Sequence, residues 1–254
     1  MGTAKLAIAG KGGVGKTTLS ATLARALASA GRRVIAVDAD PNNCLGRALG
    51  FPEDVLAGVT PLSEMRERLT TLAGRAGGGA FYELDPPVWR LIEEHLVEHA
   101  GVGLLVMGTV EEPGAGCVCP ESAVLKSVVR ALVEEEDTAL VLDMEAGLEH
   151  LGRGTARHIG ALLVVVEPTP ASARTAVRIA RLAEGLHLRV SGVVLNKSLP
   201  GADATVAPYL EGLEVIATLP FDRSLGETER VPTTGSYVEA VSALLDRLDA
   251  QVVA

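Results

Sequence analysis

The sequence predicts an α/β fold with a doubly wound, mostly parallel sheet and helices on both of its faces. Short apolar runs, typical of buried parallel strands, alternate with longer segments whose apolar residues recur at helical spacing. The chain has 254 residues, of which 48% are hydrophobic, and this is enough for one large core. We therefore expect residues 1–254 to form a single domain.

The chain opens with an apolar strand, Ala4–Ala9, then the glycine-rich segment Gly10–Thr18, GKGGVGKTT, and an alanine-rich helix, Leu19–Ala30. This order and spacing predict the phosphate-binding loop of a P-loop NTPase. Backbone N–H groups would converge on the phosphates, Lys16 would neutralise their β and γ oxygens, and the Thr17 hydroxyl would hold Mg²⁺. The residues expected to contact nucleotide here are Gly12, Gly13, Val14, Gly15, Lys16, Thr17 and Thr18.

Carboxylates follow two further predicted strands, at the edge where ligands collect in such folds. The strand Arg33–Asp38 leads into DADPNNC, which places Asp38 and Asp40 near the phosphate loop. An Asp-Pro turn with a capping role is the alternative for Asp40. The strand Thr138–Leu142 delivers Asp143, the Walker B arrangement, in which the carboxylate holds Mg²⁺ through water.

The remaining predicted strands are Gly103–Met107, Ala161–Glu167, Arg189–Leu195 and Glu214–Leu219, and the remaining helices are Leu62–Leu72, Val88–Val97, Val124–Val133, Ala171–Glu184 and Tyr237–Val253. His95 and His99 stand one turn apart on a predicted helix, a spacing that can bind metal. The glutamates around them favour a solvated helix face instead. Residues 52–100 indicate no function of their own.

Cys117 and Cys119 are separated by one residue and lie just before a predicted helix. A helix N-terminus favours the thiolate, the form that binds metal, and on an extended segment both side chains face the same way. They could therefore share one metal ion, although packing as small hydrophobic residues is the alternative. Because thiolate sites commonly have four ligands, a two-fold dimer would supply the missing pair.

The formal net charge is −9, which gives no general attraction to nucleic acid or to an anionic membrane. The longest purely apolar run, Ala161–Val166, is too short to cross a bilayer. The chain enters its first strand without a charged leader and an apolar signal region. We therefore expect a cytoplasmic protein with no nucleic-acid or membrane partner.

Lys11 is unusual, because a plain P-loop does not need a cation at that position. The form KGGVGKT resembles the deviant Walker A motif of the family that contains nitrogenase iron protein and the MinD and ParA ATPases. The resemblance implies an ATP-dependent homodimer in which Lys11 reaches the partner's phosphates and Asp40 handles the attacking water. It also places Asn196 and Pro220 near the adenine. Leu199 stands where a GTPase would need aspartate, which favours ATP.

Four segments together narrow the resemblance to the CooC-type ATPases, the nickel-insertion factors of carbon monoxide dehydrogenase. They are the phosphate loop, DADPN, GCVCPE and DMEAGLEHLGRGT. The resemblance implies an ATPase that dimerises with nucleotide, binds Ni²⁺ or Zn²⁺ between paired Cys117 and Cys119, and assists nickel insertion into carbon monoxide dehydrogenase. Cys44 is not part of the family pattern, and spacing alone assigns no role to Glu145 or His150.

Two other functions remain open. A redox ATPase like nitrogenase iron protein would hold an iron–sulfur cluster between two chains. That relative has a cluster cysteine after the Walker B segment, whereas this chain has no cysteine beyond Cys119. A positioning switch of the MinD or ParA type would bind membrane or DNA, which the acidic chain and its acidic last helix disfavour.

Overall fold

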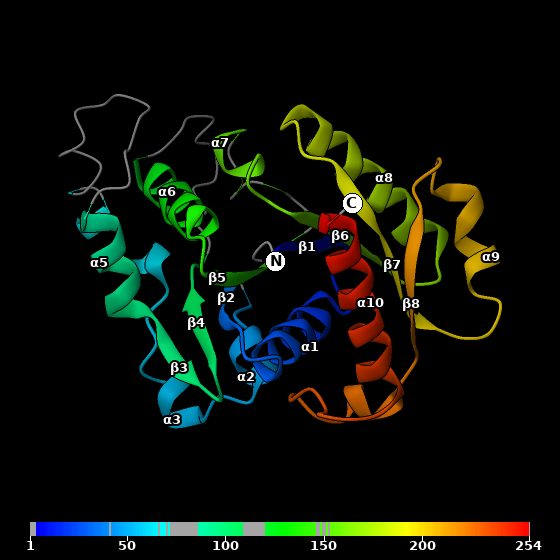
Figure 1. Cartoon of the computed structure of the whole chain (residues 1–254), viewed down its shortest axis with the longest axis horizontal. Coiled ribbons are helices and arrows are strands. Elements are labelled where there is room, and N and C mark those ends of the chain that lie inside the picture. The colour runs from blue at the N-terminus through cyan, green and yellow to red at the C-terminus, as the bar shows by residue number, and fades with distance from the viewer. Residues whose placement is uncertain are drawn as a thin grey trace.

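The fold is known from a computed structural model, which describes residues 4–40, 42–65, 67–69, 71, 86–108, 120–145, 148, 151 and 153–253. Within these residues, eight strands form one sheet in the order β3-β4-β2-β5-β1-β6-β7-β8 (Figure 1). All neighbouring strands are parallel except β3 and β4. The predicted fold class is confirmed.

The strands are β1 (Lys5–Gly10), β2 (Arg33–Ala39), β3 (Val97–His99), β4 (Val102–Val106), β5 (Thr138–Met144), β6 (Ala161–Val166), β7 (Val190–Ser198) and β8 (Val215–Pro220). The helices are α1 (Lys16–Ser29), α2 (Leu45–Leu49), α3 (Glu53–Leu56), α5 (Pro86–His95), α6 (Pro120–Glu134), α7 (Arg153–Ala156), α8 (Pro170–Gly185), α9 (Asp203–Val206) and α10 (Ser236–Val253). Short 3₁₀ turns are η1 (Leu62–Glu64), η2 (Ala207–Tyr209) and η3 (Arg223–Gly226).

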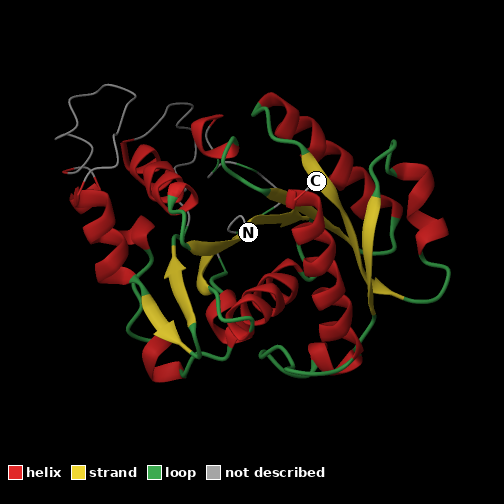
Figure 2. Ribbon diagram, viewed as in Figure 1, coloured by secondary structure: helices red, strands yellow, loops and turns green. Residues whose placement is uncertain are grey.

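The sheet separates two apolar cores because successive strand residues point to opposite faces. In β1, Leu6 and Ile8 pack with α1, α2 and α10, whereas Ala7 and Ala9 pack with α5, α6 and α8. Figures 1 and 2 show these two helical layers on either side of the twisted sheet. The same alternation places Asp38 in β2 and Asp143 in β5 on the α1 side of the sheet, the face to which Ala36 of β2 also points.

Lys5 anchors α6 to the first strand. Its buried ammonium group donates to the backbone carbonyls of Leu132 at 3.0 Å and Thr138 at 2.7 Å, and also to that of Glu135. Burial lowers the pKa of Lys5 to about 8, although the negative charge of Glu135 acts to raise it. The strand that leads into the phosphate loop and the C-terminal end of α6 are therefore tied together.

The segment around His95 and His99 differs from the prediction. The helix α5 ends at His95, and Val97–His99 forms β3, antiparallel to β4. Positive φ angles at Ala100 (49°) and Gly101 (79°) make a two-residue hairpin turn between these strands. The predicted helical spacing of the two histidines, and with it a shared helix face, is therefore wrong.

Each histidine has its own local partner instead. The Nδ1 of His95 lies 2.8 Å from the carbonyl oxygen of Leu91, one turn back in α5. The ring of His99 packs against Phe51 with ring centroids 5.3 Å apart. In the described part of the chain, no helix is both long enough and apolar enough to cross a membrane.

Candidate nucleotide site

The phosphate loop joins β1 to α1 at the carboxyl edge of the sheet. Gly13 and Gly15 have φ angles of 79° and 93°, a left-handed conformation that glycine adopts without strain, and α1 begins at Lys16 directly after Gly15. The loop faces a cavity of about 680 Å³. The lining residues include Gly12, Gly13, Gly15, Lys16, Thr17, Thr18, Asp40, Asn42, Cys44, Asn196, Lys197, Pro220, Phe221 and Asp222. This volume and this set of backbone and cationic groups suit a nucleotide.

Most of the predicted loop residues meet at this cavity, with two exceptions. The side chain of Val14 is fully buried in the core, so Val14 could contact a nucleotide only through its backbone. Lys11 is exposed and is absent from the residues that line the cavity. Lys16 is buried, and its ammonium nitrogen lies 3.5 Å from the carbonyl oxygen of Lys11. The two lysines of the loop therefore occupy different surroundings.

Asp143 lies inside β5 and is fully buried. Its Oδ1 accepts a hydrogen bond of 3.1 Å from the Ser20 hydroxyl in α1, whereas its buried Oδ2 has no hydrogen-bond partner in the described residues. Burial raises the pKa of Asp143 to about 6, although Thr17, Ser20 and Lys16 each favour the ionised form. An unpaired carboxylate oxygen beside Thr17 and Lys16 is suited to accept a hydrogen bond from a water molecule that is bound to Mg²⁺.

Asp38 and Asp40 shape the loop after β2. The buried carboxylate of Asp38 accepts from the backbone N–H of Leu45 at 2.9 Å and of Asp40 at 3.2 Å. Burial, and then the charge of Asp143, raise the pKa of Asp38 to about 7. The Oδ1 of Asp40 accepts from both the backbone and the side chain of Asn42, at 3.0 and 2.8 Å. Asp40 therefore accepts local hydrogen bonds and also lines the cavity, so both interpretations of Asp40 stay open.

The opposite end of the cavity contains the residues expected near the base. Pro220 ends β8, and Asn196 is buried in β7. The Asn196 amide nitrogen donates to the carbonyl oxygen of Val14 at 2.8 Å, and its buried Oδ1 has no partner among the described residues. That oxygen could accept a hydrogen bond from an exocyclic amino group, as adenine has.

Sequence reasoning missed several cavity residues, among them Lys197 and Cys44. Lys197 donates to the carbonyl oxygen of Gly13, and Cys44, an exposed free thiol, lies on the cavity wall. Lys197 follows directly after Asn196, yet nothing in the local sequence reveals its reach to a loop 184 residues away. The position of Cys44 after DADPNN was the only signal available for that thiol.

Cys117, Cys119 and His150 fall outside the described residues. In the part of the chain that is described, no group of three or more His, Cys, Asp or Glu side chains could hold a metal ion. The predicted thiolate site therefore remains a prediction, and Glu145 still has no assigned role.

A glycine-rich phosphate loop between β1 and α1, facing buried aspartates on neighbouring strands, defines a P-loop nucleotide-binding ATPase. Residues 5–231 match the family described as the CobQ/CobB/MinD/ParA nucleotide binding domain. The chain belongs to this family.

Similar proteins support the narrower resemblance. The chain is 38% identical to the carbon monoxide dehydrogenase accessory protein CooC of Rhodospirillum rubrum over 227 residues, 87% of this chain and 85% of that protein. It is 39% identical to an uncharacterized ATP-binding protein of Methanocaldococcus jannaschii over 230 residues, 89% of this chain and 88% of that protein. The predicted resemblance to CooC-type ATPases is confirmed.

Solved structures share the fold. The structure of the MinC:MinD cell division complex from Aquifex aeolicus matches with a TM-score of 0.68 at 22% identity, covering 97% of this chain and 96% of that one. MinD of Pyrococcus horikoshii, complexed with Mg-ADP, matches with a TM-score of 0.64 at 21% identity, covering 98% and 97% of the two chains.

Proposed function

We propose that this protein is an ATP-hydrolysing metallochaperone that dimerises with nucleotide and assists nickel insertion into a carbon monoxide dehydrogenase. The observation that carries the proposal is the 38% identity to the carbon monoxide dehydrogenase accessory protein over 87% of the chain. The Cys-x-Cys pair immediately before α6 adds a soft-metal ligand set that suits nickel or zinc.

At the nucleotide, Lys16 contacts the β- and γ-phosphates, and the Thr17 hydroxyl with the unpaired oxygen of Asp143 holds Mg²⁺ and its water. Bound Mg²⁺ neutralises the charge that develops on the phosphates. Asp40 orients or deprotonates the attacking water, and Asn196 and Pro220 contact the adenine. Residues 1–254 act as one domain.

In the dimer, the exposed side chain of Lys11 in one chain reaches the phosphates of the nucleotide that the other chain binds. Cys117 and Cys119 of the two copies then complete a four-thiolate site for the Ni²⁺ or Zn²⁺ cargo. Nucleotide and metal both favour the same closed dimer, so each tightens the binding of the other. Hydrolysis reopens the dimer and releases the metal to the client enzyme.

The test is metal content and molecular mass in solution, measured without nucleotide, with ADP and with a non-hydrolysable ATP analogue. We expect one Ni²⁺ or Zn²⁺ per dimer, with tighter metal binding in the presence of the analogue. The double variant Cys117→Ser/Cys119→Ser should lose the metal. Cys44→Ser is the matched control, because it removes a free thiol that lines the nucleotide cavity, and it should keep the metal.

Four results would count against the proposal. If the analogue changes neither metal affinity nor mass, nucleotide and metal are not coupled. Metal that persists in the double cysteine variant would exclude the shared thiolate site. Visible absorbance that reductant bleaches in anaerobically purified protein would favour an iron–sulfur redox ATPase, and ATP-dependent binding to liposomes or DNA would favour a positioning switch.

A further inference from the structure

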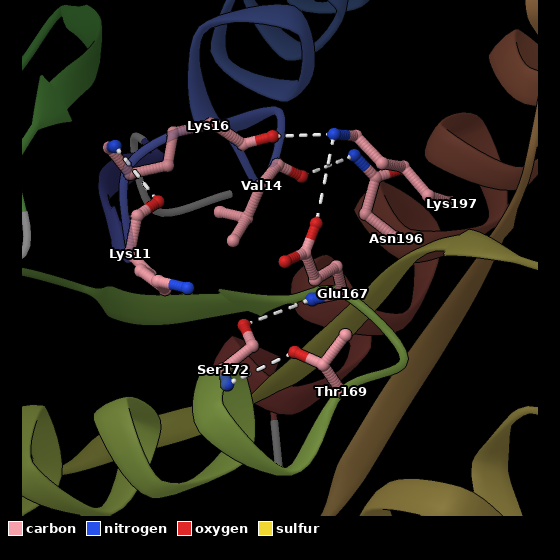
Figure 3. A network of polar contacts seen from close by, with 9 residues as sticks. Lys11, Val14, Lys16, Glu167, Thr169, Ser172, Asn196 and Lys197 are labelled. Carbon is pink, nitrogen blue, oxygen red and sulfur yellow. Dashed lines mark hydrogen bonds and ion pairs between the residues drawn. The ribbon is translucent and has the colours of Figure 1, made fainter.

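We propose that Lys197 is a positioning residue that holds the phosphate loop ready for nucleotide, and that Glu167 keeps Lys197 in place. The inference rests on nucleotide binding at this cavity and is independent of the metal and client in the proposed function. Figure 3 shows the side chain of Lys197 between the loop and the carboxylate of Glu167.

The first step is the orientation of the loop's backbone. A phosphate loop works because its N–H groups converge on the anion, so some of its carbonyl groups must point outward and find donors elsewhere. The carbonyls of Gly13 and Val14 accept from the neighbouring side chains of Lys197, at 2.5 Å, and Asn196, at 2.8 Å. The end of β7 therefore fixes two consecutive peptide groups of the loop from behind.

The second step is the backbone of Lys197 itself. Its φ angle is +54°, in the left-handed region that a lysine adopts at a cost, and the pairing of β7 with β8 is irregular between Leu195 and Ser198. This conformation persists only where surrounding contacts compensate for it. Two contacts of the side chain do so, one to Gly13 and one to Glu167.

The third step is the anchor on the other side. The carboxylate of Glu167 lies 3.8 Å from the Lys197 ammonium, and the two side chains are 26% and 41% exposed, respectively. Glu167 is itself held because its backbone N–H donates to the hydroxyl of Ser172 at 3.1 Å. The hydroxyl of Thr169 caps the same turn of α8 by accepting from the Ser172 N–H at 3.2 Å. The start of α8 thus restrains Lys197.

These contacts predict a specific functional pattern. A preorganised loop binds the β-phosphate more tightly because less ordering is needed on binding. Removal of the Lys197 side chain should therefore weaken the binding of ADP much more than the binding of AMP. ADP has a β-phosphate for the loop to bind, and AMP does not. If Lys197 instead contacted the base or the ribose directly, its removal would weaken the binding of ADP and of AMP equally.

The experiment measures the Kd of ADP and of AMP for Lys197→Met, Lys197→Gly and Lys197→Arg. We expect about a tenfold weaker Kd for ADP in Lys197→Met, the loss of one charge-assisted hydrogen bond, and little change for AMP. Lys197→Gly should bind ADP as weakly and yet be more stable than Lys197→Met, because glycine relieves the positive φ that methionine keeps. Lys197→Arg should restore much of the affinity. The control Glu211→Gly relieves a similar φ of 49° in a surface turn away from the cavity and should not alter ADP binding.

Glu167→Gln tests the anchor. It should weaken ADP binding about threefold in the wild-type background. In the Lys197→Met background it should have no effect on ADP binding, because Glu167 acts through Lys197. Equal losses for ADP and AMP, wild-type ADP affinity in Lys197→Met, or an undiminished effect of Glu167→Gln in Lys197→Met would each overturn the proposal. All of these outcomes leave metal binding by Cys117 and Cys119 as a separate question.

Discussion

Asp38 and Asp143 lie opposite each other in the register of β2 and β5, and neither side chain is exposed. Both project to the α1 side of the sheet, and their burial raises the pKa of Asp38 to about 7 and of Asp143 to about 6. Two buried carboxylates on adjacent strands are unfavourable when both are ionised. A divalent cation at their edge of the sheet would offset that cost, so its binding should stabilise the folded chain.

The Ser20 hydroxyl should make Mg²⁺ binding tighter, because its bond to Oδ1 fixes the orientation of Asp143 and leaves Oδ2 unpaired. We expect Ser20→Ala to need about tenfold more Mg²⁺ to reach half of the effect of Mg²⁺ on ADP binding, the loss of one hydrogen bond to a charged carboxylate. Asp143→Asn should have a larger effect. The measurement is ADP binding across a Mg²⁺ titration, with Mg²⁺-free binding as the reference.

Thr22→Ala is the matched control for Ser20→Ala. It removes another buried hydroxyl from α1, but that hydroxyl donates to the carbonyl of Thr18 within the helix, at 2.8 Å. The two variants should lose similar stability, and Thr22→Ala should keep the wild-type Mg²⁺ dependence. An equal Mg²⁺ shift in both variants would show that the effect of Ser20 is one of general stability.

The pH dependence of stability follows from the two aspartates. Their ordinary pKa is 3.8, so between that value and about 6 to 7 the folded chain binds more protons than the unfolded chain. The contribution of these groups to the free energy of unfolding therefore falls as the pH rises through this window. In urea unfolding without nucleotide or Mg²⁺, we expect Asp38→Asn to show a smaller fall between pH 4 and 7 than wild type. Parallel curves would contradict this prediction.

The sheet and the phosphate loop could be predicted because their signals are local. Each core strand is a run of apolar residues such as Ala161–Val166, and the loop is a fixed spacing of glycines and lysine. The edge strand Val97–His99 could not be predicted, since it has only three residues and directly follows a helix. Its turn uses Ala100, a residue with no particular tendency toward positive φ.

Motif spacing and the family resemblance selected residues that lie together in the structure. Asp40, Asn196 and Pro220 line one cavity, and their roles toward water and adenine stay predictions. The contacts of Ser20 with Asp143 and of Lys197 with Gly13 join residues 123 and 184 positions apart. Such contacts depend on how helices and strands pack, and no spacing within the sequence encodes them.

Gly15 should tolerate a side chain poorly. A Cβ there would lie 2.2 Å from the amide nitrogen of Asn196, which is buried and bonded to Val14, and the φ of 93° disfavours any other residue. We expect Gly15→Ala to lower the free energy of unfolding by about 1–3 kcal/mol. Gly12→Ala is the control, because a Cβ there meets no atom within 4 Å, and its effect should be below about 1 kcal/mol. Chemical denaturation without nucleotide tests the difference.

Cys44 offers a direct report of nucleotide in the cavity, because its exposed thiol lies on the cavity wall. Partial burial against the cavity wall, then the nearby charges of Asp38 and Asp40, raise the pKa of this thiol, so its reaction with N-ethylmaleimide should be slow near neutral pH and faster as the pH rises. In the Cys117→Ser/Cys119→Ser variant, Cys44 is the only cysteine of the three that remains. Mass spectrometry should show that Mg-ADP slows its labelling severalfold. Equal labelling rates with and without Mg-ADP, under conditions where ADP binding is saturated, would mean that the nucleotide leaves this wall of the cavity open.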